Sequence, residues 1–357
     1  MGWRFGWEEI PERSRGLTFD DLLITPNKSE IRSRRDPDLK TLFTRKIQIG
    51  IPIISANMDT ITEADMAISI RSIGGIGILH RFMSIADQAA QVAKVKEAKA
   101  TPIIASVGVN SDEKERAAAL IKAGAEGLTV DIAHGHSIAM IETVKFLKKE
   151  YPHIEVIAGN VATPEATKEL IEAGADAIKV GIGPGSMCTT RVITGCGVPQ
   201  VTAIAICAMA AKNTGVPIIA DGGIKSSGDI VKALAAGASS VMLGSMLSGT
   251  LETPGEVRQG RKQYRGMASR QAQTSWRGGV PEGMAPEGEA TTVAVKGHVR
   301  DVILELCGGI RSGMSYISAN EVKEIAEKTL FVEMSQAGYF ESHAHGVSRT
   351  TPVWDKT

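Results

Sequence analysis

The chain has 357 residues, of which 43% are hydrophobic and 22% charged, and its 40 basic and 40 acidic residues balance to a formal net charge of zero. This composition is ordinary for a globular protein and gives no electrostatic basis for binding nucleic acid or an anionic membrane, so neither is expected as a partner. No apolar run reaches transmembrane length, residues 1–15 are too polar for a signal peptide, and the cysteines form no CxxC pair, which indicates a cytoplasmic protein with reduced thiols.

From residue 51 onward, apolar runs alternate with amphipathic stretches. Continuous Ile and Val runs suit strands that are buried on both faces, and their alternation with helices predicts parallel β–α–β units. Strands are expected at residues 52–58, 77–80, 102–109, 127–134, 156–161, 177–183, 217–223 and 240–246. Helices are expected at residues 63–73, 86–98, 113–123, 138–149, 164–173, 201–213, 229–236 and 301–308.

Eight consecutive units predict an α/β fold, a (β/α)₈ TIM barrel, which typically takes about 250 residues. Gly124, Gly174 and Gly237 each separate a helix from the next strand, where glycine adopts a left-handed cap at low cost. A doubly wound open sheet is the alternative, and it is less favoured because the dinucleotide-binding glycine fingerprint is absent.

Two segments interrupt the pattern. Residues 248–298 are polar and have neither a strand nor a helix period, which is typical of a lid, so we expect an active-site flap at about residues 250–297. The tail after Phe331 is polar and is expected to be partly disordered. The chain as a whole, residues 1–357, is expected to form a single catalytic domain with an N-terminal arm.

Active sites in this fold lie at the carboxyl ends of the strands. Two of these ends carry glycines, Asp221-Gly222-Gly223 after the seventh strand and Gly244-Ser245 after the eighth. Backbone amides at these two strands often cradle a phosphate, so we expect a phosphate site here. Two tight strand-to-helix turns without a ligand are the alternative.

The end of the fourth strand carries Asp131, followed by His134 and His136. One interpretation is a metal site, although no second cluster of His or Asp completes a set of ligands. The other is that Asp131 hydrogen-bonds a ribose and that the two histidines line a cofactor groove. The sequence leaves both open.

Residues 181–191, GIGPGSMCTTR, follow the sixth strand and form a glycine-rich loop. Glycines allow the backbone to approach a ligand closely, and Pro184 prevents direct continuation into a helix. Cys188 lies next to hydroxyl groups and Arg191, a setting that favours a thiolate able to attack an electrophilic ring carbon. The alternative is a tight turn with a buried cysteine.

These motifs together resemble the IMP dehydrogenase/GMP reductase family. The resemblance rests on the cysteine loop and on residues 221–224 (DGGI) and 264–267 (YRGM), and it extends from about Leu17 to the C-terminal tail. It implies a homotetramer or an octamer, a purine nucleotide substrate (GMP or IMP), a nicotinamide cofactor and a covalent bond from Cys188 to purine C2. The CBS domain pair of many dehydrogenases is absent, since residues 99–101 lead straight into the third strand.

Within the family, the sequence favours a GMP reductase, which uses NADPH to deaminate GMP to IMP and ammonia. Dehydrogenases carry an adjacent Arg-Tyr pair on the flap to activate water, and residues 275–280 (SWRGGV) contain none. Ser33-Arg34 resembles the reductase pair that reads NADPH, and a guanidinium suits its 2′-phosphate. Residues 197–200 (GVPQ) look instead like a dehydrogenase. The alternatives are therefore an IMP dehydrogenase that uses NAD and a purine nucleotide-binding protein without catalysis.

The resemblance also implies roles for individual residues. Catalysis is expected from Cys188, with Thr190 and Glu287 moving protons. Substrate contacts are expected from Ser186, Asp221, Gly222, Gly223, Gly244, Ser245, Tyr264, Arg265, Gly266, Met267 and Ala268. Cofactor contacts are expected from Ser33, Arg34, Asp131, Ile132, Ala133, Gly181, Ile182 and Gly183. A monovalent cation, K⁺, is expected on Gly183, Gly185 and Cys188 and on a neighbouring subunit's segment equivalent to Glu341, Ser342 and His343.

Overall fold

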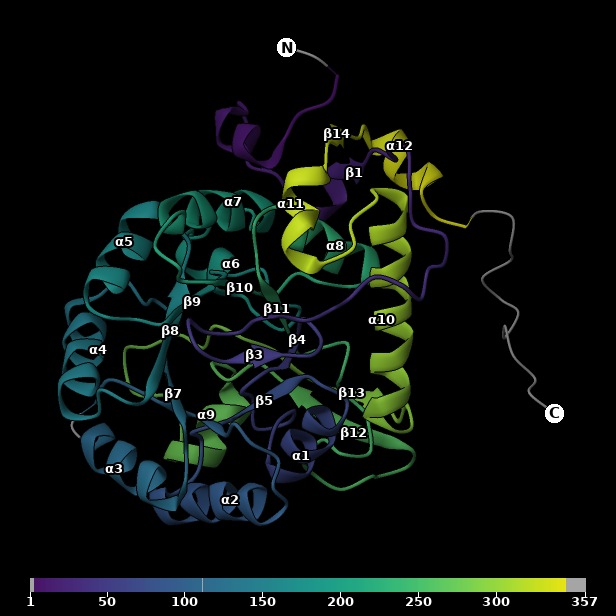
Figure 1. The fold of residues 1–357 in the computed structure, drawn as a ribbon. Coiled ribbons are helices and arrows are strands. Elements are labelled where there is room, and N and C mark those ends of the chain that lie inside the picture. The colour runs from purple at the N-terminus through teal and green to yellow at the C-terminus, as the bar shows by residue number, and fades with distance from the viewer. Residues whose placement is uncertain (1–2, 111, 345–357) are drawn as a thin grey trace.

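The computed structural model describes residues 3–110 and 112–344, and eight parallel strands in it close into a barrel. The strands follow one another around the barrel in chain order, and the last pairs with the first, so the predicted (β/α)₈ fold is confirmed (Figure 1). The strands are β4 (Ile53–Ser55), β5 (Ile76–Leu79), β6 (Ile104–Val107), β7 (Gly127–Asp131), β8 (Glu155–Val161), β9 (Ala177–Val180), β10 (Ile218–Asp221) and β11 (Ser240–Leu243).

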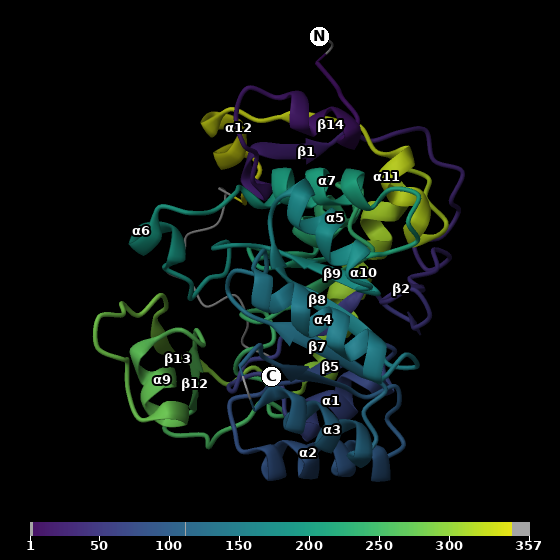
Figure 2. The same ribbon diagram turned by 90° about the vertical axis from the view of Figure 1, so that its left-hand side faces the viewer.

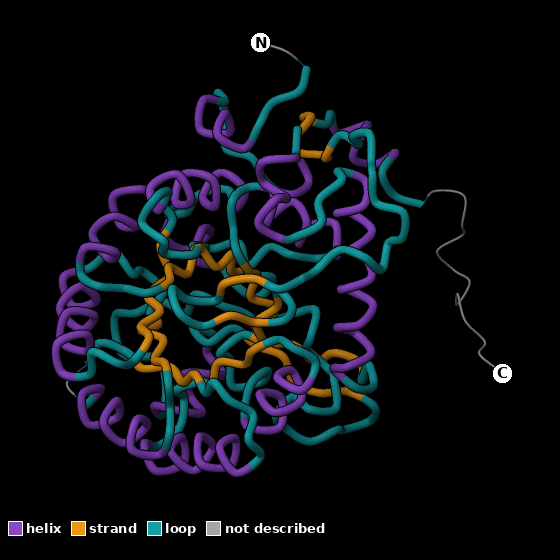
Figure 3. The backbone as a smooth tube through the Cα atoms, in the orientation of Figure 1, coloured by secondary structure: helices purple, strands orange, loops and turns teal. Residues whose placement is uncertain are grey.

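Helices surround the ring of strands, as the tube in Figure 3 makes plain. Side chains of Ser84, Ser137, Thr163 and Ser226 cap four of them at the N-terminus, which satisfies backbone amides that have no partner inside the helix. The helices are α1 (Ala64–Ser72), α2 (Ile85–Glu97), α3 (Glu113–Ala123), α4 (Ile138–Glu150), α5 (Pro164–Glu172), α7 (Gln200–Ala211), α8 (Ser227–Ala235) and α10 (Val299–Tyr316).

The last helix is longer than the sequence predicts, since α10 continues through Gly308 and Gly309 to Tyr316. Consecutive glycines weaken a helix, which is why the expected helix ended there. Gly309 is needed for packing, however, because a Cβ at this position would lie 2.1 Å from Ser227 Oγ on α8. Close contact between the two helices therefore outweighs the low intrinsic helix propensity.

Successive residues along each strand face different cores. On β4, Ile53 belongs to the layer between strands and helices, whereas Ile54 belongs to the cluster inside the barrel. The hairpin of β2 (Thr41–Leu42) and β3 (Gln48–Ile49) places buried Phe43 and Ile49 in the same interior cluster. It joins the barrel where the strands begin, since Thr41 Oγ1 donates to the carbonyl of Ser239, the residue before β11. This end of the barrel is therefore closed.

The flap contains regular structure, contrary to the expectation from its polar sequence. Strands β12 (Arg261–Arg265) and β13 (Ala290–Ala294) form an antiparallel hairpin, with helix α9 (Arg270–Arg277) between them. The alternation of polar and apolar residues that would mark a strand is not visible in β12, because one of its two buried positions is the charged Lys262 and the other is Tyr264. Figure 2 shows this unit beside one end of the barrel and β2 at the opposite end.

The N-terminal arm and the end of the chain pack together outside the barrel. Strand β1 (Leu22–Ile24) pairs with β14 (Phe331–Glu333), and helix α12 (Gln336–Glu341) follows. The expected disorder of the tail concerns residues that include 345–357, which lie outside the described part of the chain. Residues 98–103, between α2 and β6, contain no inserted domain. No helix among the described residues is both long and apolar enough to cross a membrane.

Candidate active site

A cleft of about 590 Å³ opens at the carboxyl ends of the barrel strands, beneath the flap. The opposite end is closed by the β2–β3 hairpin, so the mouth of the barrel is the accessible face. Of the residues that the sequence singles out, the cleft is lined by Asp131, Ile132, Ala133, Gly181, Ile182, Gly183, Gly185, Ser186, Cys188, Thr190, Asp221, Gly222, Gly223, Gly244, Ser245, Tyr264, Gly266, Met267, Ala268 and Glu287.

The glycine-rich loop turns sharply out of β9 and presents Cys188 to the cleft. Gly181 has φ of 151°, and a Cβ there would lie 2.0 Å from the carbonyl oxygen of Asp221, so only glycine fits. Cys188 is exposed, which excludes the alternative of a buried structural cysteine. Arg191, on the short helix α6 (Thr190–Thr194), donates to the carbonyls of Ile182 and Val198 and so holds the loop closed on itself.

A chain of hydrogen bonds leads from the thiol to a carboxylate on the flap. Cys188 Sγ donates to Thr190 Oγ1 at 3.2 Å, and Thr190 Oγ1 donates to Glu287 Oε2 at 2.8 Å. The backbone positions this carboxylate, because Glu287 N donates to Ala268 O at 3.0 Å and Glu287 O accepts from Thr189 N at 3.2 Å. A proton on the sulfur therefore has a continuous path to Glu287.

The ends of β10 and β11 supply backbone groups and hydroxyls on one side of the cleft. Gly222 and Gly223 both have positive φ, 95° and 81°, which points to a turn that other residues rarely adopt. The hydroxyl of Tyr264 lies 3.0 Å from Ser186 Oγ, which places a flap strand against the cysteine loop. Burial raises the pKa of Tyr264.

A buried lysine that sequence reasoning missed joins the two acidic strand ends. Lys179 Nζ lies 2.9 Å from Asp131 Oδ1 and 2.7 Å from Asp221 Oδ2, and it donates to Asn160 Oδ1 as well. Burial by itself would lower the pKa of Lys179, but the two carboxylates outweigh that effect and raise it above the usual value. An ammonium thus sets the spacing between Asp131 and Asp221.

The structure does not assemble the possible metal site at the end of β7. Asp131 is paired with Lys179, whereas His136 Nε2 lies 3.4 Å from Glu169 Oε2. Within residues 3–110 and 112–344, no group of three or more His, Cys, Asp or Glu side chains is placed to hold a metal ion. The role of Asp131 toward a ribose stays a prediction.

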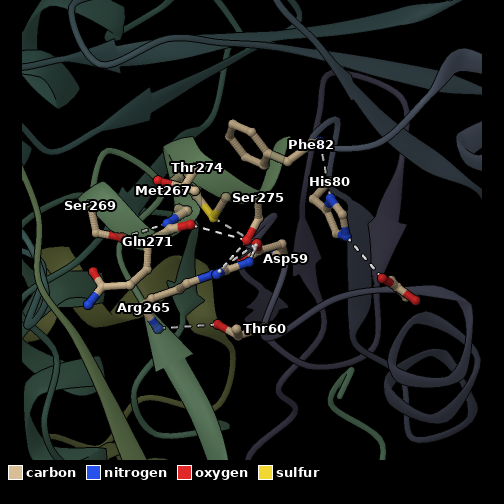
Figure 4. Close-up of polar contacts among 12 residues, drawn as sticks. Asp59, Thr60, His80, Phe82, Arg265, Met267, Ser269, Gln271, Thr274 and Ser275 are labelled. Atoms are coloured by element: carbon tan, nitrogen blue, oxygen red, sulfur yellow. Dashed lines mark hydrogen bonds and ion pairs between the residues drawn. The ribbon is translucent and has the colours of Figure 1, made fainter. Parts of the chain in front are cut away.

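Several expected site residues lie away from this chain's cleft. Arg265 is not among the lining residues, because its guanidinium is used by Asp59 and Ser275 (Figure 4). Arg34 lies against the ring of Tyr316, where α10 ends, with 5.8 Å between the guanidinium carbon and the ring centroid. Ser33 belongs to the same turn. The segment formed by Glu341, Ser342 and His343 lies at the end of α12, and none of its residues lines the cleft.

Other lining residues had no assigned role in the sequence. Arg81 and Asn160 stand at strand ends, and this position is the feature of the sequence from which their place in the cleft could have been predicted. Trp276 and Arg277 come from α9, whose existence the sequence pattern did not indicate. Lys179 was hidden because it lies inside a strand and is only 2% exposed.

Comparison with known proteins identifies the family and corrects one expectation. The family described as "IMP dehydrogenase / GMP reductase domain" matches residues 16–345. Inosine-5′-monophosphate dehydrogenase of Cryptosporidium parvum is 44% identical over 93% of this chain and 96% of its own length. The enzymes of that name from Aquifex aeolicus and Nitrosopumilus maritimus are 38% and 37% identical over 94% of this chain, and 96% and 99% of their own lengths.

These names contradict the prediction of an NADPH-dependent GMP reductase and favour the dehydrogenase alternative. The absence of an Arg-Tyr pair on the flap was the main reason for that prediction, and it was given too much weight. Two adjacent flap residues are weaker evidence than identity with the dehydrogenases over more than nine-tenths of the chain. On the family match and these identities, the chain belongs to the IMP dehydrogenase/GMP reductase family.

Proposed function

We propose that this chain is an IMP dehydrogenase, which oxidises IMP to XMP with NAD. The observation that carries the proposal is its identity of 37–44% with enzymes of that name over more than nine-tenths of both chains. The exposed Cys188 and its hydrogen-bonded path to Glu287 support it, because both are suited to covalent attack on a purine ring.

The substrate is proposed to lie across the β9–β11 side of the mouth. Glycines at the ends of β10 and β11, together with the hydroxyls of Ser186 and Tyr264, offer donors to a phosphate. Asp221 is suited to accept hydrogen bonds from the ribose hydroxyls. This orientation directs the base toward Cys188, on the loop between these groups and the flap.

The residues of the chain then have distinct tasks in the reaction. The Cys188 thiol passes its proton through Thr190 to Glu287, the sulfur bonds to C2 of IMP as the C2–N3 double bond opens, and N3 takes the proton from Glu287. When bound, the nicotinamide supplies the acceptor for the hydride that leaves C2. Water then adds to the Cys188-bound C2 and passes one proton through Thr190 to Glu287. The C2–S bond breaks as the added oxygen releases its remaining proton to solvent and Glu287 returns its proton to the sulfur, which gives XMP and the free thiol. General acid–base help of this kind is worth about 10²–10⁴-fold in rate.

The cleft residues fit a nicotinamide dinucleotide, and the chain's own residues favour NAD over NADPH. Asp131 offers a carboxylate to a ribose, and Arg81 Nε and Trp276 Nε1 are buried in the wall without a partner among the described residues. The arginine expected to read a 2′-phosphate, Arg34, lies beside the end of α10 rather than at this chain's cleft. Arg34 therefore gives no support for NADPH at this chain's own cleft.

The cation and the assembly remain predictions within this proposal. Carbonyls of Gly183, Gly185 and Cys188 are expected to bind K⁺, completed by Glu341, Ser342 and His343 of another subunit. A tetramer in size-exclusion chromatography with light scattering, together with activation by K⁺ but not by Na⁺, is the expected result. A monomer with full activity would contradict both.

The test of the function is a comparison of two substrate pairs. IMP with NAD should give a steady rise in reduced-nicotinamide absorbance and an equal amount of XMP by chromatography. GMP with NADPH should give little change in the same band. Consumption of NADPH and GMP, with no NADH formed from IMP, would overturn the proposal.

A further inference from the structure

The chain leaves the barrel for the flap through a run of tight turns, residues 244–253, which we call the exit segment. It begins directly after β11 with Gly244 and Ser245, the strand end proposed to bind the substrate phosphate. Its first turn is closed, since Leu247 N and Ser248 N both donate to Gly244 O at 3.0 Å. One short segment therefore connects the phosphate turn to the flap.

Three carbonyl oxygens near the end of the exit segment converge on one ammonium, that of Lys262 on β12. Its Nζ donates to Thr250 O at 3.2 Å, to Leu251 O at 3.0 Å and to Thr253 O at 2.5 Å. An ammonium has three protons, so all of them are engaged. Lys262 is only 4% exposed, and no described carboxylate forms an ion pair with it. The carbonyls therefore surround this ammonium as they would a small cation, but one that is covalently attached to the flap.

The next residue on the same face of β12 reaches the other end of the exit segment. Lys262 and Tyr264 are the two buried positions of the strand, and alternate residues of a strand point to one side. The hydroxyl of Tyr264 lies 3.0 Å from Ser186 Oγ, and a Cβ on Gly244 would lie 3.3 Å from it. The strand thus holds the exit segment at two points, with the ammonium near its end and the phenol near its start.

A second lysine contacts the exit segment from the returning side of the flap. Lys296 follows β13, and its Nζ donates to Ser245 O at 3.1 Å and to Met246 O at 3.3 Å. Lys296 is exposed, so water can take over its hydrogen bonds if the side chain is removed. Water has no such access to the buried carbonyls around Lys262. Of the two lysines, Lys262 is therefore the one whose loss the segment cannot easily compensate.

We propose that Lys262 is a positioning residue for the substrate phosphate, with its ammonium acting as an internal cation of the exit segment. It does not touch the substrate. It fixes β12 on the exit segment, and this contact sets Tyr264 and Ser245 at the place proposed for the phosphate. Without the ammonium, three buried carbonyls lose their donor and the segment must rearrange to reach water, which moves the phosphate donors with it. The inference rests on the proposed function, which places IMP in this cleft.

The experiment is chemical rescue of Lys262→Ala. This substitution removes the atoms that propylammonium contains, so added propylammonium can enter the vacated space and restore the charge. The KM for IMP should rise by roughly tenfold or more, whereas kcat should fall by less than about threefold, because Cys188, Thr190 and Glu287 are intact. Propylammonium should return the KM toward the wild-type value. Propanol, which has a similar size but no charge, should not.

Two variants control for volume and for the strand itself. Lys262→Met fills the space without a charge, so it should show the same rise in KM and no response to propylammonium. Gln263→Ala changes the exposed face of the same strand and should keep the wild-type KM with or without the amine. Calorimetric titration with IMP should show the same pattern of affinities in the absence of turnover.

A wild-type KM in both Lys262 variants would overturn the positioning role, even if their thermal midpoints fall, because the lysine would then serve stability alone. Equal rescue by propanol and propylammonium would also overturn it, since volume rather than charge would be the missing property. If Lys262→Ala does not fold, the IMP affinity of Lys262→Met decides, and an unchanged value contradicts the proposal. Failure of IMP oxidation in the wild type, with IMP binding lost and rescued as described, would overturn the proposed function and leave the role of Lys262 supported.

Discussion

The ammonium of Lys179 lies 2.7 Å from the carboxylate of Asp221, at the mouth end of the barrel interior. Lys179 is only 2% exposed, so this charge exists because Asp221 and Asp131 compensate it. The two carboxylates in turn depend on the lysine, since Asp131 at the end of β7 and Asp221 at the end of β10 both approach its ammonium. Removing one member leaves an uncompensated charge in a low-dielectric site.

Lys179→Met is therefore expected to lower the free energy of unfolding by about 3–5 kcal/mol. Lys94→Met is the control, because Lys94 pairs with Asp65 at the surface, where such pairs contribute about 0–1 kcal/mol. Urea denaturation of both variants measures the difference. Equal losses would show that the buried cluster contributes no more than a surface pair.

The same substitution has a defined pH dependence. The pKa of Lys179 is raised by its two carboxylates, so its contribution to stability is complete below the ordinary lysine value of about 10.4 and is lost only above it. The difference between wild type and Lys179→Met should thus be constant from about pH 6 to about pH 9. A contribution that falls steadily across this neutral range would contradict the ion-pair assignment.

Cys188→Ala is expected to abolish IMP oxidation and to keep IMP binding within about tenfold, because the proposed phosphate and ribose contacts remain. Cys196→Ala is the matched control, since Cys196 is also exposed and lies on the same segment but outside the cleft. Mass spectrometry after brief iodoacetamide treatment should find Cys188 protected by IMP. Substantial turnover by Cys188→Ala would exclude covalent catalysis.

Glu287→Gln should reduce kcat by about 10²–10⁴-fold, because an amide cannot accept the proton that Thr190 relays. Thr190→Val should have a similar effect, and the double variant should be little worse than either, since both break one path. Glu282→Gln, also on the flap but exposed and outside the cleft, should remain near wild type. Losses that multiply in the double variant would mean that the two residues act independently.

Arg265→Met should loosen the flap, because Asp59, which is only partly exposed, would lose its partner and Ser275 would lose its anchor. Amides of α9 are expected to exchange faster with deuterium, whereas those of β4 and β5 keep their protection. Arg258→Gln, which breaks a surface pair before the same hairpin, should leave α9 unchanged. Unaltered exchange of α9 in Arg265→Met would show that other contacts hold the flap.

The barrel was predictable because its signal is local and repeated. Ile and Val runs, amphipathic stretches and the glycines at positions 124, 174 and 237 recur along the chain, and each glycine does adopt the positive φ expected of it. Cys188 was predictable for a similar reason, since glycines and hydroxyls surround it within one continuous loop. Such patterns depend on neighbours in the sequence, and so one sequence is sufficient to read them.

Contacts between distant segments were decided only by the tertiary structure. Lys179 gave no sign of its role, because its strand reads as apolar and the carboxylates that compensate it come from β7 and β10. The flap looked irregular, since β12 and β13 stabilise each other across 24 intervening residues. The resemblance already paired Thr190 with Glu287, but only the fold shows that these two residues, 97 apart in the sequence, lie 2.8 Å from each other.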